Sequence, residues 1–589
     1  MAFPYSKWCF PKPQYVSTTK AHLSTTTNNA NKWNILHQNP STSPLISPPL
    51  QDDIISIKHA EKLMELKHVL LRKSSSHNNN SLQGLHMIDA IQRLNVDYHF
   101  QDEIDAFLQR HYVISTTSAA AFSHHDNLHH LALSFRLLRQ QGHFVPQEVF
   151  EKFTDKEGKF KQELLLEGGG NNNIVKGVMD LYEASQVSIK GEDMLDEAGE
   201  FSLKFLKERL AFSHNDDDDE AKLLRSTMET PFHKSLPMFT ALDSFQDFHG
   251  GMNSNDNGWW FGSLKTLAKM DLTLLQRLYK KEIIQISKWW TKLGLANELK
   301  YARNQPLKWY IWSLACLSDP NLSQERIELT KPISFIYIID DIFDVYGTLD
   351  ELTLFTDVVS RWDVNTVPDE LPDYMKVCFR ALYDVTNEIS FKIYQKHGWE
   401  PKDYLRKTWE RLCKAFLVEA KWFDSGKNPS AEEYLKNGII SSGVHIVLIH
   451  IFFMLGEGLT NQNVKIIDGI PDIISSTATI LRLWDDLGNA EDENQEGNDG
   501  SYVDCLLMEK KRLSRKEARD QVMNLINDAW KRLNQECLFE RTFPAAFRKA
   551  SLNLARMVPL MYTYDNNHSL PKLEQQVKSL IYQNNSLFI

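Results

Sequence analysis

The chain has 589 residues, of which 42% are hydrophobic, and a formal net charge of -11. This length predicts two domains, each able to bury a core of its own. The negative charge, together with the lack of any stripe of Lys and Arg interleaved with aromatic residues, excludes nucleic acid as the expected partner.

The first 50 or so residues differ in composition from the rest of the chain. They contain four lysines and many Ser and Thr, and no acidic residue precedes Asp52. Such a segment cannot build a core and resembles an organelle transit peptide, so residues 1–50 are predicted to be a plastid leader and the protein to reside in the plastid stroma. No arginine occurs before Arg72, so a disordered tail on a cytoplasmic protein is the alternative.

Helical periodicity dominates the chain from about Ile54 onward. Apolar residues recur at i, i+3, i+4 and i+7, as in Leu63, Leu66 and Leu70, and no convincing alternating strand occurs. The pattern predicts an all-α protein.

Polar and glycine-rich interruptions divide the helical sequence. They predict surface loops at residues 74–81, 167–173 and 215–220. The segment GGMNSNDNG at residues 250–258 is the predicted boundary between an N-terminal domain, residues 51–258, and a C-terminal domain, residues 259–589.

Neither the cysteines nor the apolar runs indicate a covalent framework or a membrane anchor. The six cysteines are scattered without a C-x-x-C pair, which argues against disulfides and against a cysteine zinc site and fits a reducing compartment. The longest apolar run, residues 444–455, is interrupted by His445 and His450 and is too short to span a bilayer. We therefore expect a soluble protein with no membrane partner.

Residues 334–352 read SFIYIIDDIFDVYGTLDEL, an apolar helix that ends in acid. Asp340 and Asp344 are four residues apart and share one helix face, while Asp341 lies to one side. Ionised carboxylates that close would repel one another unless a cation lay between them, and a hard divalent ion such as Mg²⁺ prefers oxygen ligands. The alternative is an acidic helix end that reaches solvent.

Residues 478–505 repeat this design in ATILRLWDDLGNAEDENQEGNDGSYVDC. Asp485, Asn489 and Glu493 at i, i+4 and i+8 present three oxygen ligands on one face, which predicts a second metal site. Arg482, one turn earlier, is placed to hold a phosphate oxygen. The two helix ends together predict metal ions that face each other across a cavity in a helical bundle and bind a diphosphate.

These motifs, with FRLLRQQGHFV (135–145), LYEAS (181–185) and YLKNGIISSG (434–443), resemble plant class I terpene synthases over nearly all of the chain after the first 50 residues. The resemblance implies two helical domains, an N-terminal α-barrel without catalytic duty and a C-terminal bundle that holds the chemistry. It also implies a small-molecule prenyl diphosphate substrate, three Mg²⁺ ions with Mn²⁺ as the alternative, and a monomer.

The resemblance assigns roles to individual acids. Asp340 and Asp344 match the first and last acids of the family's DDxxD motif, and Asp485, Asn489 and Glu493 match its second metal motif. Asn489 stands where Ser or Thr is usual, but its amide oxygen can still ligate. The catalytic set implied is Asp340, Asp344 and Asp485.

The resemblance also assigns substrate-binding residues. Arg482 matches the family's diphosphate-binding arginine, and Arg303 is the one arginine left of an R-x-R element because Gln305 replaces the second. Trp312 and Tyr562 match aromatic residues at the active site, where a ring can stabilise a carbocation. Ordinary core packing is the alternative for both rings.

Two further clusters resemble other metal or acid sites. Asp216 to Asp219 satisfy the D-x-D-D pattern of class II terpene cyclases, but a run of like charge predicts a solvated loop. The histidines around His129-His130 hint at a metal phosphohydrolase, but a solvated helix start is the preferred interpretation.

The predicted product is acyclic. The chain lacks the tandem arginine followed by tryptophan of monoterpene cyclases, and DENQEGNDGSY is most similar to the linalool and nerolidol synthases. We therefore predict linalool from geranyl diphosphate by water capture, with residues 489–502 forming a loop that orders when metal and substrate arrive. Nerolidol from farnesyl diphosphate in the cytosol, or myrcene or ocimene by deprotonation, are the alternatives within the family. A prenyl-elongating synthase and a non-catalytic helical binding protein are the rival classes.

Overall fold

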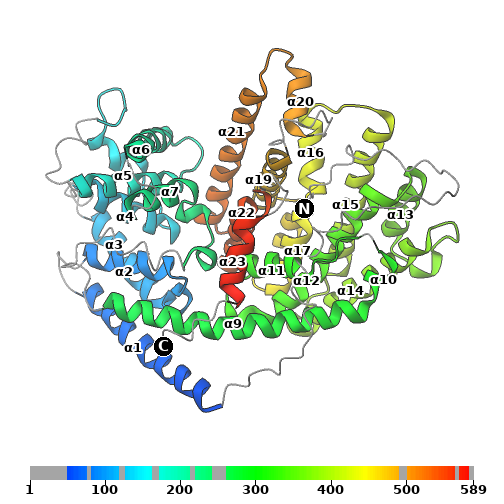
Figure 1. The fold of residues 1–589 in the computed structure, drawn as a ribbon, viewed down its shortest axis with the longest axis horizontal. Helices are drawn as coiled ribbons and strands as arrows, with labels where there is room; N and C mark the ends of the chain where they lie inside the picture. The colour runs from blue at the N-terminus through cyan, green and yellow to red at the C-terminus, as the bar shows by residue number, and fades with distance from the viewer. Residues whose placement is uncertain are drawn as a thin grey trace, which may run out of the picture. The chain divides into compact units, whose positions relative to one another are not determined.

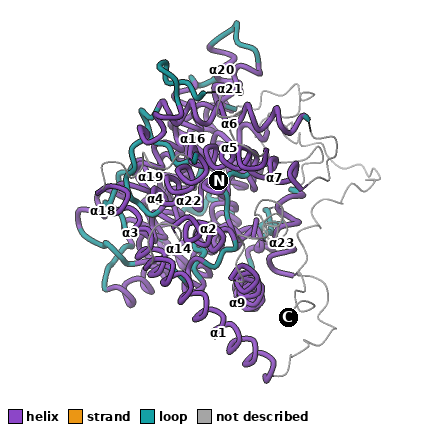
Figure 2. The backbone as a smooth tube through the Cα atoms, turned by 90° about the vertical axis from the view of Figure 1, so that its left-hand side faces the viewer, coloured by secondary structure: helices purple, strands orange, loops and turns teal. Residues whose placement is uncertain are grey.

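The computed structural model describes residues 49–75, 81–117, 127–161, 171–212, 219–241, 260–300, 302–489, 501–563 and 570–582. Helices joined by loops make up these residues, and the β-structure within them is a single isolated bridge between Thr154 and Phe160 (Figures 1 and 2). The all-α prediction is confirmed.

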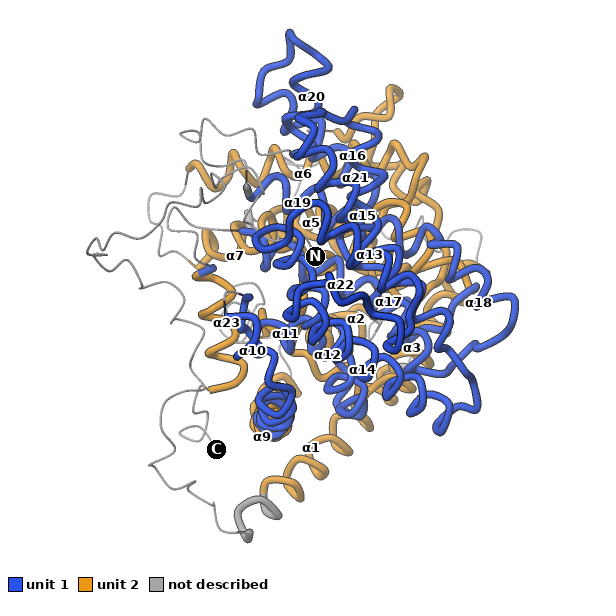
Figure 3. Tube along the Cα trace, turned by 90° about the vertical axis from the view of Figure 1, so that its right-hand side faces the viewer, with its two compact units in different colours: residues 1–45, 280–529, 542–570 blue, residues 46–279, 530–541, 571–589 orange. Residues whose placement is uncertain are grey.

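The described chain divides into two compact units (Figure 3). Unit 1 takes its described residues from Lys280–Ala529 and Thr542–Leu570, and unit 2 from Ile46–Tyr279, Trp530–Arg541 and Pro571–Ile589. The 34-residue helix α9 (Trp260–Leu293) runs from unit 2 into unit 1. The predicted boundary at residues 250–258 lies outside the described residues, and so does the predicted leader at residues 1–50 except for its last two residues, which begin α1.

Unit 2 consists of the helices that precede α9 and of short C-terminal segments. Its elements are α1 (Pro49–Ser75), α2 (Ser81–Arg93), η2 (Asp97–His99), α3 (Gln101–Thr117), α4 (Leu128–Gln140), η3 (Gln147–Phe153), α5 (Asn171–Ser185), α6 (Asp193–Ala211), α7 (Asp219–Glu229), η5 (Phe232–Lys234), η9 (Gln535–Phe539) and α23 (Pro571–Tyr582). Helix α5 begins at Asn171, so the loop predicted to run to residue 173 ends earlier than expected.

Unit 1 is the larger helical bundle. Its elements are α10 (Leu295–Glu298), α11 (Pro306–Cys316), η6 (Pro320–Leu322), α12 (Ser323–Asp341), the π-helix η7 (Ile342–Tyr346), α13 (Leu349–Arg361), η8 (Val364–Thr366), α14 (Asp373–His397), α15 (Lys402–Ser425), α16 (Ala431–Ser441), α17 (Val444–Leu455), α18 (Asn461–Asp468), α19 (Asp472–Asn489), α20 (Tyr502–Glu509), most of α21 (Arg515–Asn534) and α22 (Ala545–Tyr562).

The core of unit 1 is built around helices that are apolar on every side. Helix α11 packs against both α12 and α22, and α17 packs against α12, α19 and α22. Such all-round apolar helices bury themselves among other helices. Helices α12 and α19, which carry the two acidic motifs, are therefore held by shared neighbours.

One stretch, Ala431–Leu455, is long and apolar enough to cross a membrane, but 83% of its most apolar window is buried inside the protein. It is two helices, α16 and α17, separated at Gly443, whose φ of 70° suits glycine. This stretch is core of unit 1.

The described cysteines and the histidines of α4 are all accounted for by packing or hydrogen bonds. Five cysteines are described, and each is free and buried. The prediction of a solvated helix start fails at His129, which is buried and hydrogen-bonded to His86 and Asp180. Asp180 follows 51 residues later in the chain, so local sequence could not reveal it. Residues 213–218, which hold most of the D-x-D-D run, are not among those described.

Candidate active site

The first acidic motif lies where α12 ends. The apolar residues of α12 pack on α11 and α17, and this packing carries Asp340 and Asp341 inward, leaving them only 3% and 6% exposed. Asp344, half-buried, follows in the π-helix η7 rather than in continued α-helix, which corrects the expected helical register. Such π-turns within helices occur frequently at functional sites. The alternative of an acidic helix end in solvent is excluded by the burial.

Arg303 is the counter-ion of the first motif. Its Nη2 lies 2.6 Å from Asp340 Oδ2 and 2.6 Å from Asp341 Oδ1, and its backbone N–H donates to Asp341 Oδ2 over 2.7 Å. Burial opposes the charge of the guanidinium, but Asp341 and Asp340 raise the pKa of Arg303 and keep it cationic. The sequence assigned no role to Asp341. Its carboxylate contacts both the backbone N–H and the guanidinium of Arg303.

Arg303 does not keep the pKa of Asp340 at the ordinary value of a carboxylate. Burial, followed by the charge of Asp344, raises the pKa of Asp340 well above its ordinary value, although Arg303 opposes that rise. Carboxylates that share a site in this way favour either a retained proton or an additional cation. The first motif therefore has the donor set and the excess negative charge that a divalent ion requires.

The second motif lies near the end of α19 and repeats the arrangement. Asp485 and Asp486 are 2% and 1% exposed, and Arg482 Nη2 lies 3.1 Å from Asp486 Oδ1. The Tyr434 hydroxyl donates to Asp486 Oδ1 over 2.9 Å and accepts a hydrogen bond from Arg482. The backbone N–H of Tyr502, at the start of α20, donates to Asp486 Oδ2 over 3.1 Å. Asp486 thus forms an ion pair with Arg482, as Asp341 does with Arg303.

Asp485, the first acid of the second motif, differs from Asp486 in its hydrogen bonding. Its Oδ1 is buried without a hydrogen-bond partner among the described residues, which is costly for a carboxylate oxygen. Burial raises the pKa of Asp485 to about 8, although the charges of Arg482 and Arg303 both oppose the rise. A buried carboxylate oxygen without a partner fits a metal ligand. Asn489 ends α19, its side chain is not described, and Glu493 lies beyond the described residues.

Charges of the two motifs act on one another within unit 1. Arg303, bound to the first motif, lowers the pKa of Asp485 in the second. Both motifs act on Lys308 on α11: burial and the charge of Arg303 lower its pKa to about 7, although Asp485 opposes this effect. The sequence signal for Lys308 is a lone lysine inside the apolar run LKWYIW, to which no role was assigned from the sequence.

Trp312 and Tyr562 are 0% and 1% exposed. The indole N–H of Trp312 donates to the Tyr337 hydroxyl over 3.0 Å, and the Tyr337 ring lies 5.3 Å from the Arg303 guanidinium carbon. Trp312 is thus connected to the first motif through Tyr337. Its role toward a substrate, like that of Tyr562, stays a prediction.

Comparison with known proteins agrees with this arrangement. Residues 291–532 match the metal binding domain of the terpene synthase family, and residues 33–228 match the terpene synthase N-terminal domain. A probable terpene synthase of Ricinus communis is 53% identical over 91% of this chain and 90% of its own length. The chain is a member of the terpene synthase family. It is therefore a lyase-type enzyme, and the elongating and non-catalytic rival classes are set aside.

Other relatives and a solved structure refine the comparison. An (E)-nerolidol synthase of Cannabis sativa is 51% identical over 85% of this chain and 88% of its own length. The chloroplastic S-(+)-linalool synthase of Arabidopsis thaliana is 46% identical over 89% and 88%. Isoprene synthase of grey poplar, solved with three Mg²⁺ ions and dimethylallyl-S-thiolodiphosphate, superposes with a TM-score of 0.80 at 34% identity, over 90% of this chain and 98% of that one. The terpene synthase described here thus shares a metal-binding domain and the two-domain helical fold.

The raised pKa of Asp485 predicts a pH-dependent response of this terpene synthase to metal. Without metal, its folded-state pKa of about 8 exceeds the unfolded value near 4, so its contribution to stability is full below about pH 4 and is lost as pH rises through about 8. Metal binding needs the deprotonated carboxylate, so the Mg²⁺ concentration for half-maximal thermal stabilisation should fall about tenfold from pH 6 to pH 7. Thermal unfolding over a Mg²⁺ series measures it.

In Asp485→Asn, the Mg²⁺ concentration for half-maximal thermal stabilisation should change little with pH. The variant keeps the shape of the side chain but cannot titrate. A wild-type half-saturation that does not change with pH would contradict the assignment of Asp485 as a metal ligand.

Proposed function

We propose that this terpene synthase ionises geranyl diphosphate and releases linalool and diphosphate. The observation that carries the proposal is the pair of buried double-aspartate motifs. In each motif the second acid pairs with an arginine, and burial raises the pKa of the first acid. Asp340 shares Arg303 with Asp341, and Asp485 Oδ1 has no hydrogen-bond partner among the described residues. This pattern separates two tasks. The first acids are proposed to ligate metal, although Asp340 also contacts Arg303, and the second acids are proposed to position the arginines that bind the substrate's phosphates.

The metal ligands proposed are Asp340 and Asp344 in the first motif and Asp485, Asn489 and Glu493 in the second. Bound Mg²⁺ supplies Lewis-acid charge that neutralises the departing diphosphate. Three ions are proposed by analogy with the grey poplar structure, with Mn²⁺ as the alternative. The unpartnered Oδ1 of Asp485 and the crowded carboxylates around Asp340 fit such ions.

Arg303 and Arg482 are proposed to bind diphosphate oxygens. Both are half-buried, and neighbouring acids keep them cationic. A guanidinium offers several N–H donors in a fixed plane, so it can contact a phosphate while part of its fork stays on Asp341 or Asp486. Lys308 adds a buried amine close to both motifs and compensates for Gln305 in the incomplete R-x-R element.

The apolar lining proposed for the cation includes Trp312 and Tyr562. Aromatic faces stabilise positive charge without reacting with it, and the dense packing of α11 and α22 excludes bulk water. The carbocation then ends by capture of one admitted water, which gives linalool, or by proton loss, which gives myrcene or ocimene. The missing tandem arginine and the relation to a linalool and a nerolidol synthase favour water capture.

The length of the prenyl substrate is proposed to depend on the compartment in which the protein resides. A plastid leader at residues 1–50 favours the ten-carbon substrate, in keeping with the chloroplastic linalool synthase relative. Without a functional leader, the cytosolic reaction would be nerolidol formation from farnesyl diphosphate.

Product analysis tests the proposal. Protein lacking residues 1–50 is incubated separately with geranyl and farnesyl diphosphate in Mg²⁺ buffer, and products are separated by chiral gas chromatography. We expect linalool to dominate with the ten-carbon substrate. Cyclic hydrocarbons as the main products would overturn the acyclic assignment, and no turnover of either substrate would overturn the function.

Gly438 gives a finer test of Arg482. A Cβ at Gly438 on α16 would lie 2.9 Å from Arg482 Cγ and 3.0 Å from its Cδ, so Gly438→Ala should displace the guanidinium. Alanine is the better helix former by about 1 kcal/mol, so stability should not fall much. Loss of one charge-assisted hydrogen bond to diphosphate should raise KM about tenfold.

The control for this substitution is Gly262→Ala on α9, where an added Cβ meets nothing within 4 Å. It should leave KM unchanged. Equal KM values for Gly438→Ala and the wild type would show that Arg482 does not bind substrate.

A further inference from the structure

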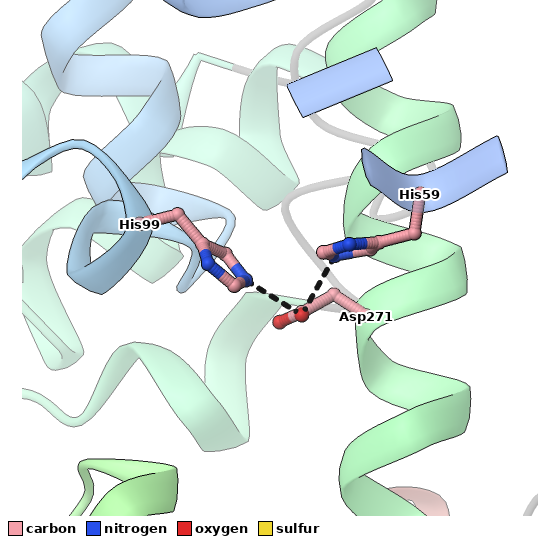
Figure 4. Close-up of side chains that lie close together, drawn as sticks. All are labelled: His59, His99 and Asp271. Atoms are coloured by element: carbon pink, nitrogen blue, oxygen red, sulfur yellow. Dashed lines mark hydrogen bonds and ion pairs between the residues drawn. The ribbon is translucent and has the colours of Figure 1, made fainter. Parts of the chain in front are cut away.

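Three side chains from distant parts of unit 2 converge on one point. His59 on α1 and His99 in η2 each place Nε2 beside Oδ1 of Asp271 on α9, at 3.1 Å and 2.9 Å (Figure 4). The three ligand atoms all lie within 4.8 Å of one another. His59 precedes Asp271 by 212 residues and His99 precedes it by 172, so only the folded chain brings them together.

The cluster has the burial and support of a built site. His59 and Asp271 are buried and His99 is half-buried, so one side stays open for an ion to enter. The Tyr98 hydroxyl donates to the other carboxylate oxygen, Asp271 Oδ2, over 2.6 Å. A hydrogen bond of that kind orients a ligating carboxylate toward its metal.

We propose that His59 Nε2, His99 Nε2 and Asp271 Oδ1 form a Zn²⁺ site, independent of the proposed terpene synthase chemistry. Two imidazole nitrogens and one carboxylate are a donor set suited to zinc and poorly suited to Mg²⁺, which prefers oxygen. Tetrahedral zinc with bonds of 2.0–2.1 Å sets its ligand atoms about 3.4 Å apart. The observed separations from Asp271 Oδ1 fall short of that by a few tenths of an ångström, within the reach of small side-chain rotations.

The competing state is a purely hydrogen-bonded cluster. In it, both histidines carry a proton on Nε2 and donate to Asp271, and the Asp271 pKa is lowered by these hydrogen bonds against the opposing effect of burial. For zinc to bind, each Nε2 must give up its proton while Nδ1 carries one, so that both ligands are neutral imidazoles, and a water is the fourth ligand. The ion would fasten α1 and η2 to α9 within unit 2, a structural role rather than a catalytic one.

Zinc content tests the proposal. Chelator-treated full-length protein is dialysed against Zn²⁺ in excess Mg²⁺, which competes for the carboxylate-rich motifs of unit 1, and bound zinc is measured by mass spectrometry. We expect one zinc per chain and an increase in Tm of about 5 °C at saturating zinc. Cobalt in place of zinc should give the visible absorption bands of a tetrahedral site with nitrogen ligands.

Variants separate metal binding from hydrogen bonding. His99→Gln keeps an N–H that can donate to Asp271 but removes the ligand nitrogen, so it should lose zinc, the cobalt spectrum and the zinc-dependent Tm shift. His68→Gln, an exposed histidine on the same helix as His59, should keep all three, and so should Asp340→Ala in the proposed catalytic motif.

Each result decides the proposal. If folded wild-type protein binds no zinc in Mg²⁺ buffer, the zinc site is overturned, even if His99→Gln does not fold. The site is also overturned if His99→Gln retains zinc or if Asp340→Ala loses it. Because activity is not the readout, failure here leaves the proposed linalool synthesis untouched, and failure of that synthesis leaves the zinc site untouched.

Discussion

Replacement of Asp485 by asparagine is expected to lower kcat/KM with geranyl diphosphate by about 10²–10³-fold, a loss of about 3–4 kcal/mol of transition-state stabilisation. Asparagine has nearly the same shape, so the packing of α19 should survive. What is lost is the negative oxygen that has no hydrogen-bond partner and is proposed to ligate metal. Product release measured in Mg²⁺ buffer, with circular dichroism to verify folding, gives the result.

Asp472→Asn is the matched control, because Asp472 is an exposed acid at the start of the same helix. It should retain wild-type activity. Folded Asp485→Asn that turns over within threefold of the wild type would remove the second motif from the proposed mechanism.

Replacement of Glu282 by glutamine is expected to reduce the free energy of unfolding by about 3–5 kcal/mol, because it leaves a buried guanidinium without its counter-ion. Glu282 on α9 receives Arg326 Nη2 on Oε1 over 2.6 Å and Arg326 Nε on Oε2 over 2.9 Å, and both residues are 0% exposed. The Tyr310 hydroxyl on α11 donates to the same carboxylate over 2.8 Å. The cluster anchors the start of α12, whose other end carries Asp340, so activity should fall with stability.

Urea titration of tryptophan fluorescence measures the change. Lys396→Gln provides the comparison, since it removes the surface ion pair to Glu325, the neighbour of Arg326, and exposed pairs contribute about 0–1 kcal/mol. If Glu282→Gln cost no more than Lys396→Gln, the buried cluster would not be the anchor of α12.

Much of the candidate site could be read from local spacing. The apolar run before Asp340 and the position of Arg482 one turn before Asp485 depend on residues within a few turns of one another, which helical periodicity positions directly. Resemblance to the terpene synthases then extended these local patterns to Arg303 and Trp312.

The pairing of charges could not be read in this way. Arg303 meets Asp341 across 38 residues and Tyr434 meets Asp486 across 52, and no sequence period specifies which distant side chains will share a buried space. The π-helix at Ile342–Tyr346 likewise departed from the α-helical register assumed for Asp344.

The sequence by itself determined an all-helical chain with two acid-ended apolar helices, because hydrophobic period and charge position act locally. Tertiary structure alone decided that Asp340 and Asp341 share Arg303 while Asp486 pairs with Arg482 and Asp485 Oδ1 has no hydrogen-bond partner among the described residues, because burial and long-range contacts set which carboxylates are neutralised. Tertiary structure also brought His59, His99 and Asp271 together, since helix packing closed chain separations of 172 and 212 residues that no local sequence pattern spans.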